Sequence, residues 1–371
     1  MIPFLDLKAQ YAEIAPELEA AVLAALRSGN YVLGEPVQQF ESAFAAYCGT
    51  TSCVALNTGT SALHLALLAA GIGPGDEVIT VPMTFVATVA AIIYSGATPV
   101  FVDIDPDTWT MDPGRVEAAI TPRTKAIMPV HLHGRLADMA ALVPIARRHG
   151  LVIIEDAAQA HGAARDGVRA GAFGDIGCFS FYPGKNLGAC GEGGAIVTDN
   201  ADYAALIRSL RDWGQEGRYN HVRHGFNYRM DALQGAALGI KLAHLDRWNA
   251  ARRRIANTYW EALAGDVGLP AGPFGADHAA HVYAIRVGDR DAVRAALEGA
   301  GVATNIHYPR PVHLQPAYAG LGYAAGDFPV AEGFAAEALS LPLYPELGAA
   351  DQDHVIAAVN AVTVASRSKV A

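Results

Sequence analysis

One lysine stands in a stretch whose composition suits covalent chemistry. Lys185 lies within residues 179–194, where aromatic residues precede it and glycines surround it closely. Lysine is rarely buried without a partner, and burial lowers the pKa of its ammonium group. A buried lysine can therefore act as a nucleophilic amine and form a Schiff base with a carbonyl compound. The alternative from these residues alone is a surface lysine on a tight turn.

A carboxylate that suits the same site ends an apolar run. Asp156 follows residues 152–155, and ligands of open α/β sheets bind outside the carboxyl ends of the strands. A buried aspartate must pair with a cation, and a protonated pyridine nitrogen is such a cation. Gln159 lies three positions further on, close enough to bond a hydroxyl group of the same ring. The alternative is an aspartate that caps the following helix.

A third motif offers a seat for an anion. Gly59, Thr60 and Ser61 follow a short apolar strand and open a helix. Free amide groups, two hydroxyls and the helix dipole together favour a phosphate group. The alternative is an ordinary helix N-cap, because serine and threonine cap helices routinely.

Three further residues suit the flat or the anionic part of a ligand. Phe85 follows a strand, where an aromatic ring can stack on a planar cofactor, although a lone phenylalanine more often belongs to the core. Asn227 and Arg229 lie among glycine and aromatic residues just before a long helix and suit an anionic group. The alternative for them is another capped helix start.

Composition and charge exclude several classes of function. The chain has 371 residues, 52% of them hydrophobic, and its net charge of −10 argues against a nucleic-acid partner. No basic region followed by an apolar run opens the sequence, and the apolar run 78–102 is interrupted by prolines and a glycine, so neither a signal peptide nor a membrane span is expected. The four cysteines show neither metal-like nor disulfide spacing. We therefore expect a cytoplasmic protein without a metal site.

The order of elements predicts an α/β fold with two domains. Apolar runs separated by helical segments predict a mostly parallel sheet covered on both faces. We expect a large domain over 1–244 and a smaller α+β domain over 245–371, with the N-terminal segment packed on the small domain. The strands are expected at 53–57, 78–81, 98–102, 126–130, 152–155, 178–181, 194–198, 279–287 and 304–308.

Taken together, the motifs resemble those of the DegT/StrS group of nucleotide-sugar aminotransferases, a branch of the fold type I enzymes that use pyridoxal 5'-phosphate (PLP). The likeness runs almost end to end. It includes GTSAL (59–63), TFVAT (84–88), EDAAQAHGA (155–163), FSFYPGKNLGA (179–189) and FNYRMD (226–231). The resemblance implies an aspartate aminotransferase-like large domain that binds PLP.

The resemblance also implies roles for single residues. Lys185 would hold the cofactor and move protons, and Asp156 would keep the pyridine nitrogen protonated. Gln159 would bond the ring hydroxyl and Phe85 would stack on the ring. The phosphate would be held by Gly59, Thr60, Ser61 and Ser180. Asn227 would reach a neighbouring subunit's phosphate, which implies a homodimer with shared active sites. Substrate contacts are expected from Tyr31, Tyr182, Arg229, His307 and His313.

The activity implied by the resemblance is transfer of an amino group from an amino acid, L-glutamate first, to a keto group of a dTDP-, UDP- or GDP-linked deoxysugar. One alternative is a keto-cyclitol aminotransferase. Another is a PLP-dependent sugar dehydratase of the same fold, in which a histidine replaces the lysine. A binding or regulatory protein is the non-enzymic alternative. The sequence departs from the common pattern at 190–192 and at His133, where a tyrosine is usual, so the substrate stays open.

Overall fold

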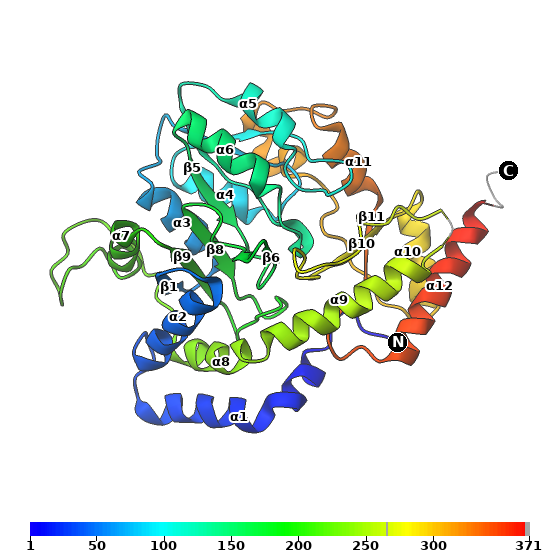
Figure 1. The fold of residues 1–371 in the computed structure, drawn as a ribbon, viewed down its shortest axis with the longest axis horizontal. Helices are drawn as coiled ribbons and strands as arrows, with labels where there is room; N and C mark the ends of the chain where they lie inside the picture. Colours follow the sequence, from blue (N-terminus) through cyan, green and yellow to red (C-terminus); the bar gives the residue numbers. More distant parts are fainter. Residues whose placement is uncertain (265, 368–371) are drawn as a thin grey trace.

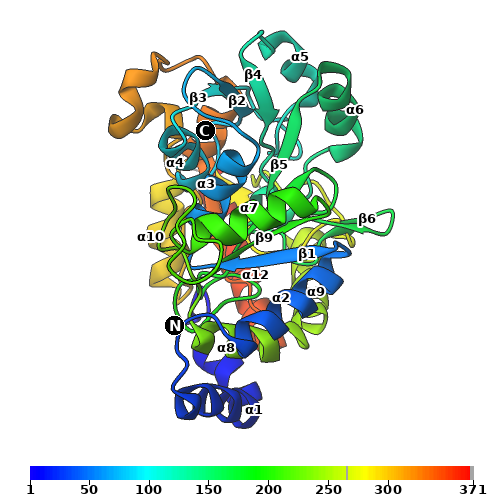
Figure 2. The same ribbon diagram turned by 90° about the vertical axis from the view of Figure 1, so that its left-hand side faces the viewer.

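The computed structural model describes residues 1–264 and 266–367, and a seven-stranded sheet forms the centre of this part of the chain (Figures 1 and 2). The strand order is β1-β9-β8-β5-β4-β2-β3. β9 runs antiparallel to both of its neighbours, and the other four pairings are parallel, which confirms the predicted mostly parallel sheet. The strand bounds are Ser52–Leu56 (β1), Glu77–Thr80 (β2), Thr98–Phe101 (β3), Thr124–Ile127 (β4), Val152–Asp156 (β5), Ile176–Ser180 (β8) and Gly194–Thr198 (β9).

Helices cover both faces of the sheet, which explains why its strands are apolar throughout. In β1, Cys53 and Ala55 pack in a core with Phe40 of α2, whereas Val54 and Leu56 pack on the opposite face with residues of α3. Because successive side chains of a strand point to opposite faces of the sheet, β1 contributes residues to two separate cores. The helices of this part are α1 (Leu7–Ser28), α2 (Glu35–Cys48), α3 (Gly59–Ala69), α4 (Ala87–Tyr94), α5 (Val116–Ala119), α6 (Met139–His149), α7 (Ala201–Arg211) and α8 (Ala232–Leu242).

The C-terminal third forms a smaller group of elements beyond the long helix α9 (Leu245–Ala262), which extends from the sheet toward α10 and α12 (Figure 1). There β10 (Tyr283–Arg286) pairs antiparallel with β11 (Ala338–Leu341). The helices are α10 (Arg290–Gly299), α11 (Pro329–Glu337) and α12 (Ala349–Arg367). The N-terminus joins this group, because Ile2 bonds to the backbone of Gly301 and Ala303. The division at 244/245 stays a prediction.

The predicted strand at 304–308 is wrong. Only Asn305 pairs there, exchanging backbone hydrogen bonds of 3.1 and 2.7 Å with Ser340. The chain then turns back to the large sheet, where Val312 donates to the carbonyl of Pro82 at 2.8 Å. The sequence prediction also missed β11, α11 and a short hairpin of β6 (Ala164–Arg165) and β7 (Val168–Arg169).

The apolar run at 78–102 folds as predicted into strand, helix and strand, namely β2, α4 and β3. Among the residues that the structure describes, no helix has both the length and the apolar character needed to cross a membrane.

Gly194 lets two backbone segments cross next to the start of α3. A Cβ atom at this position would lie 2.2 Å from the carbonyl oxygen of Thr58 and 2.6 Å from the amide nitrogen of Gly59. We expect Gly194→Ala to lower the free energy of unfolding by about 1–3 kcal/mol, because neither backbone can yield without distortion. Urea unfolding measures this loss. Gly239→Ala in α8, where the added methyl meets nothing within 4 Å, should be neutral or stabilising. Equal free energies of unfolding for the two variants would contradict the close backbone approach at Gly194.

Candidate active site

The carboxylate predicted to carry chemistry ends β5 at the edge of the sheet. Asp156 is 5% exposed, and it accepts hydrogen bonds from the hydroxyl of Thr88 at 2.6 Å and from the amide of Ala158 at 3.2 Å. Burial raises the pKa of Asp156, while these two donors and the charge of Lys185 oppose that rise. Thr84 bonds in turn to the hydroxyl of Thr88 at 2.7 Å, so the carboxylate is held by a chain of hydroxyls from the start of α4.

Lys185 lies in the loop after β8 and is only partly exposed. Desolvation lowers the pKa of its amine to about 8, against the attraction of the Asp156 carboxylate, which raises it. Four imidazoles are close enough to feel its charge. Burial is the first cause that keeps their pKa values below the ordinary range, and the charge of Lys185 adds to it. These imidazoles are those of His133, His161, His281 and His307. They are therefore neutral at physiological pH, and Lys185 and Asp156 dominate the charge of the site.

The backbone beside Lys185 is fixed by a buried amide network. Asn186 is 1% exposed, and its Nδ2 donates to Oδ1 of Asn249 and to the carbonyl of Ala279, both at 2.8 Å. Its Oδ1 contacts Nδ1 of His281 at 3.0 Å. Since Nδ2 is already the donor, this oxygen must accept from the imidazole. The network ties the lysine loop to α9 and to the segment before β10.

We expect the low pKa of Lys185 to govern how fast the cofactor-free protein captures PLP. Only the neutral amine attacks an aldehyde, so the capture rate should rise with pH, reach half its limit near pH 8 and level off above it. Stopped-flow absorbance measures this rate. In Asp156→Asn the midpoint should fall further, because the carboxylate stabilises the ammonium form. A capture rate that keeps rising beyond pH 10 would contradict the lowered pKa of Lys185.

The predicted anion seat is a capped helix start, and the cap is compatible with an anion at the same place. Thr58 caps α3 by accepting from the amide of Ser61 at 3.0 Å, and the Ser61 hydroxyl donates to Oδ1 of Asn57 at 2.7 Å. The cap leaves the amide groups of Gly59 and Thr60 at the positive end of the helix for an anion. Ser180 touches this end, because a Cβ at Gly59 would lie 2.6 Å from its Cβ.

Two of the predicted cofactor-binding side chains, Phe85 and Gln159, both contact Tyr308. Phe85 is 52% exposed, so it is not the core residue that a lone phenylalanine usually is, and its ring centroid lies 5.6 Å from that of Tyr308. Gln159 is buried, and its Nε2 donates to the hydroxyl of Tyr308 at 3.1 Å. An exposed ring and a buried amide donor thus face the same residue.

The residues expected to contact substrate do not all come together. Tyr31 and Tyr182 are exposed, as is Asn227. Arg229 forms an ion pair with Asp212 at 2.6 Å. His307 is bonded to the hydroxyl of Ser340 at 2.9 Å and lies near Lys185.

His313 does not join this group. It is 2% exposed, packs against Phe101 and Phe328, and bonds to Glu332 at 3.1 Å. An imidazole enclosed in this way has no free surface for a substrate. The sequence around His313 gave no hint of this, because the covering residues come from β3 and from the segment before α11.

Two residues at the site, Thr88 and Tyr308, were not singled out by the sequence prediction, and His133 was noted only as a departure from the family pattern. Thr88 lies four positions after Thr84 in the TFVAT motif. Two threonines at this spacing, whose hydroxyls can meet, were the available signal in the sequence. Tyr308 and His133 reach the site by tertiary folding, and no local pattern places them there.

The donor set fits PLP. An amine of lowered pKa can take an aldehyde, a buried carboxylate can hold a pyridinium, and a helix start with a serine beside it can hold a phosphate. These groups sit at the carboxyl edge of a mostly parallel sheet, where such folds bind ligands. Fold and donor set together fit a PLP site.

Comparison with known proteins agrees with this class. The chain belongs to the DegT/DnrJ/EryC1/StrS aminotransferase family, whose model matches residues 12–360. It is 49% identical over 360 residues to a dTDP-3-amino-3,4,6-trideoxy-alpha-D-glucose transaminase of Streptomyces venezuelae, covering 96% of this chain and 95% of that protein. It is 47% identical to a pleiotropic regulatory protein of Geobacillus stearothermophilus, covering 96% of each.

A solved structure extends the likeness to three dimensions. The crystal structure of S. venezuelae DesV in complex with a ketimine intermediate superposes with a TM-score of 0.95 at 49% identity, covering 97% of this chain and 98% of that one. The predicted family and the predicted fold type I architecture are therefore confirmed.

Proposed function

We propose that the protein is a PLP-dependent aminotransferase that moves an amino group from an amino acid, L-glutamate first, to a keto group of a nucleotide-linked deoxysugar. The observation that carries this proposal is the pairing of Lys185, with its pKa near 8, and the buried Asp156 at one edge of the sheet. The names of the transaminase relative and of the aligned DesV structure support it.

The residues of the site divide the work. PLP, when bound, supplies an electron sink for the carbanion that forms at the donor's α-carbon. Asp156 would hold the pyridine nitrogen protonated. Lys185 would hold the cofactor through its aldehyde group and would move the proton that leaves the α-carbon of the amino donor. Gln159 donates to the ring oxygen and Phe85 covers the ring. The phosphate would be held by Gly59, Thr60 and Ser180, and by Ser61 once its hydroxyl turns away from Asn57.

Substrate and subunit contacts follow from the exposed side chains. Tyr31 and Tyr182 offer aromatic surface, and His307 lies beside the lysine. Arg229 must exchange its partner Asp212 if it is to bind a substrate anion.

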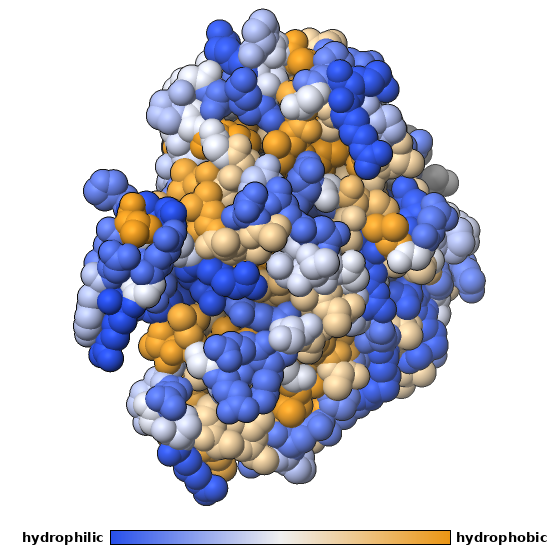
Figure 3. All heavy atoms as spheres, turned by 60° about the vertical axis from the view of Figure 1, so that its left-hand side comes forward, coloured by the Kyte–Doolittle hydropathy of each residue, from blue (hydrophilic) through white to orange (hydrophobic). Residues whose placement is uncertain are grey.

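Several apolar patches, separated by hydrophilic residues, lie on the face drawn in Figure 3. This surface and the exposed Asn227 support a homodimer in which Asn227 reaches the partner's phosphate.

The cysteines suit a reducing compartment, because all four are free thiols: Cys48, Cys53, Cys178 and Cys190. We therefore place the enzyme in the cytoplasm.

Three rivals make different predictions. A sugar dehydratase of this fold would have a histidine where Lys185 stands. A regulatory protein, as one relative is named, would not need Lys185 and Asp156, and both are present. A keto-cyclitol aminotransferase keeps the chemistry and changes only the acceptor.

The deciding experiment offers the PLP-loaded protein a panel of dTDP-, UDP- and GDP-linked ketosugars, with a keto-cyclitol beside them, and glutamate labelled with ¹⁵N. Mass spectrometry of the products separates amination from loss of a hydroxyl group. We expect a labelled amino sugar nucleotide. A deoxygenated product would establish the dehydratase, a labelled cyclitol the third rival, and no turnover of any acceptor would favour the regulatory protein.

A further inference from the structure

His133 closes a ring of hydrogen bonds around the buried amide of Gln159. The backbone N–H of His133 donates to Oε1 of Gln159 at 2.6 Å, and Nε2 of Gln159 donates to the hydroxyl of Tyr308 at 3.1 Å. Nε2 of His133 lies 3.1 Å from the carbonyl oxygen of His307. Since His307 and Tyr308 are adjacent in the chain, the three bonds form a closed circuit.

The chemistry of the partners fixes the direction of each bond. A carbonyl oxygen can only accept, so the proton of the His133 imidazole must be on Nε2. Burial holds the pKa of His133 near 3, so the ring stays neutral and keeps this single donor. Oε1 of Gln159 points to the backbone amide of His133, so its NH₂ group points to Tyr308. On that side Gln159 therefore presents a donor.

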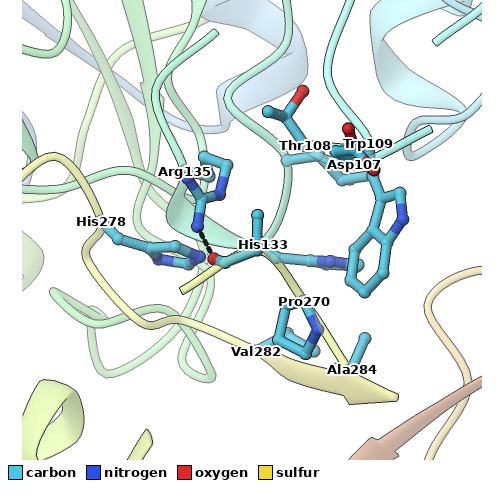
Figure 4. A pocket seen from close by; sticks show the side chains of 11 residues that line it. Asp107, Thr108, Trp109, His133, Arg135, Pro270, His278, Val282 and Ala284 are labelled. Carbon is cyan, nitrogen blue, oxygen red and sulfur yellow. Dashed lines mark hydrogen bonds between the residues drawn. The ribbon is translucent and has the colours of Figure 1, made fainter. Parts of the chain in front are cut away.

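The backbone conformation and the packing of His133 hold its side chain in a single orientation. The residue is 3% exposed and has φ 60° and ψ 5°, a left-handed conformation that is uncommon for residues other than glycine. Figure 4 shows its ring extending toward Trp109, above β10 and apart from His278 in the same pocket. Trp109 and Phe334 pack on the ring at centroid distances of 6.2 and 5.9 Å.

We propose that His133 is a positioning residue for the cofactor site. Its backbone amide fixes Gln159 as a donor toward the cofactor's ring oxygen, and its imidazole holds the carbonyl of His307 so that Tyr308 stays against the Gln159 amide. The segment 305–312 is thereby tied to the edge of the large sheet. This inference rests on the proposed function, because the ring oxygen belongs to PLP.

A matched pair of substitutions isolates the imidazole donor. In His133→Gln the amide nitrogen stands the same number of bonds from the backbone as Nε2 and can donate to the same carbonyl. In His133→Asn the amide is too short to reach it. Asparagine tolerates the left-handed conformation of residue 133 better than glutamine does. Backbone strain therefore cannot explain a greater loss in His133→Asn than in His133→Gln. His278→Asn is the control in the same pocket, because Nδ1 of His278 accepts only from the amide two residues on, which an asparagine oxygen can replace.

Two measurements read the effect. The dissociation constant for PLP, from absorbance titration, should rise about three- to tenfold in His133→Asn and stay within about twofold in His133→Gln and His278→Asn, as expected for one neutral hydrogen bond. Amide hydrogen exchange over 305–312 should accelerate only in His133→Asn. Adding Tyr308→Phe to His133→Asn should cost no more affinity than the larger single effect, because both break the same circuit.

Equal losses in the glutamine and asparagine variants, or additive losses with Tyr308→Phe, would overturn the proposal. The exchange measurement uses cofactor-free protein and so separates this inference from the proposed function. If the unaltered chain bound no PLP, the proposed function would fall, and the role toward the cofactor with it. Unchanged exchange over 305–312 in His133→Asn would overturn the inference alone.

Discussion

Replacing Lys185 by alanine should abolish amino transfer, with a fall in turnover of at least about 10³-fold. The variant loses both the amine that takes the cofactor aldehyde and the base that carries the proton. The methyl group leaves the loop intact, because Asn186 and its buried network hold the backbone. Turnover with labelled glutamate and the visible absorbance of bound PLP are the two measurements.

The matched control for this prediction is Lys125→Ala, which removes an exposed lysine of β4. It should retain full turnover and the absorbance of the unaltered protein. Both halves of the reaction need Lys185, so turnover should fall alike with every active acceptor. Full transamination by Lys185→Ala would refute the assignment of this lysine.

Asp156→Asn is expected to lower turnover by about 10²–10³-fold, the size of effect seen when one preorganised electrostatic group is removed from an active site. An amide cannot hold the pyridine nitrogen protonated, so the ring withdraws electrons less well. Cofactor affinity should fall far less, because the anion seat at α3 and Lys185 are unchanged. Steady-state turnover and PLP titration measure the two losses separately.

Asp166→Asn serves as the control, since Asp166 is an exposed turn residue at φ 53°, a conformation that asparagine also accepts. It should leave both turnover and affinity unchanged. If Asp156→Asn bound PLP far more weakly but kept its turnover at saturating PLP, the carboxylate would only anchor the cofactor, and its electronic role would be wrong.

Much of the large lobe was predictable because its signals are local. Each strand of the sheet is a short apolar run between helices, and Asp156 follows such a run directly, so its place at a strand end needed no tertiary knowledge. The anion seat was equally local, since Thr58, Gly59 and Ser61 are neighbours that cap one helix. Lys185 was marked by composition, and the resemblance then gave the role.

What the sequence did not show depends on contacts between distant segments. Thr88 bonds to a carboxylate 68 positions away, and His133 bonds to a carbonyl 174 positions away. His313 has the residue type of a ligand-binding group, yet residues far from it in the chain enclose it. The C-terminal lobe was predicted less well because its strands β10 and β11 pair across more than fifty residues, and neither run is long.

The most direct test of the central claim is to trap the cofactor on the protein. The PLP-loaded chain is reduced with borohydride, digested, and its peptides are analysed by mass spectrometry. We predict the phosphopyridoxyl group on Lys185 and on no other lysine. A label on Lys241 or Lys125, or a reduced protein without any label, would contradict the assignment.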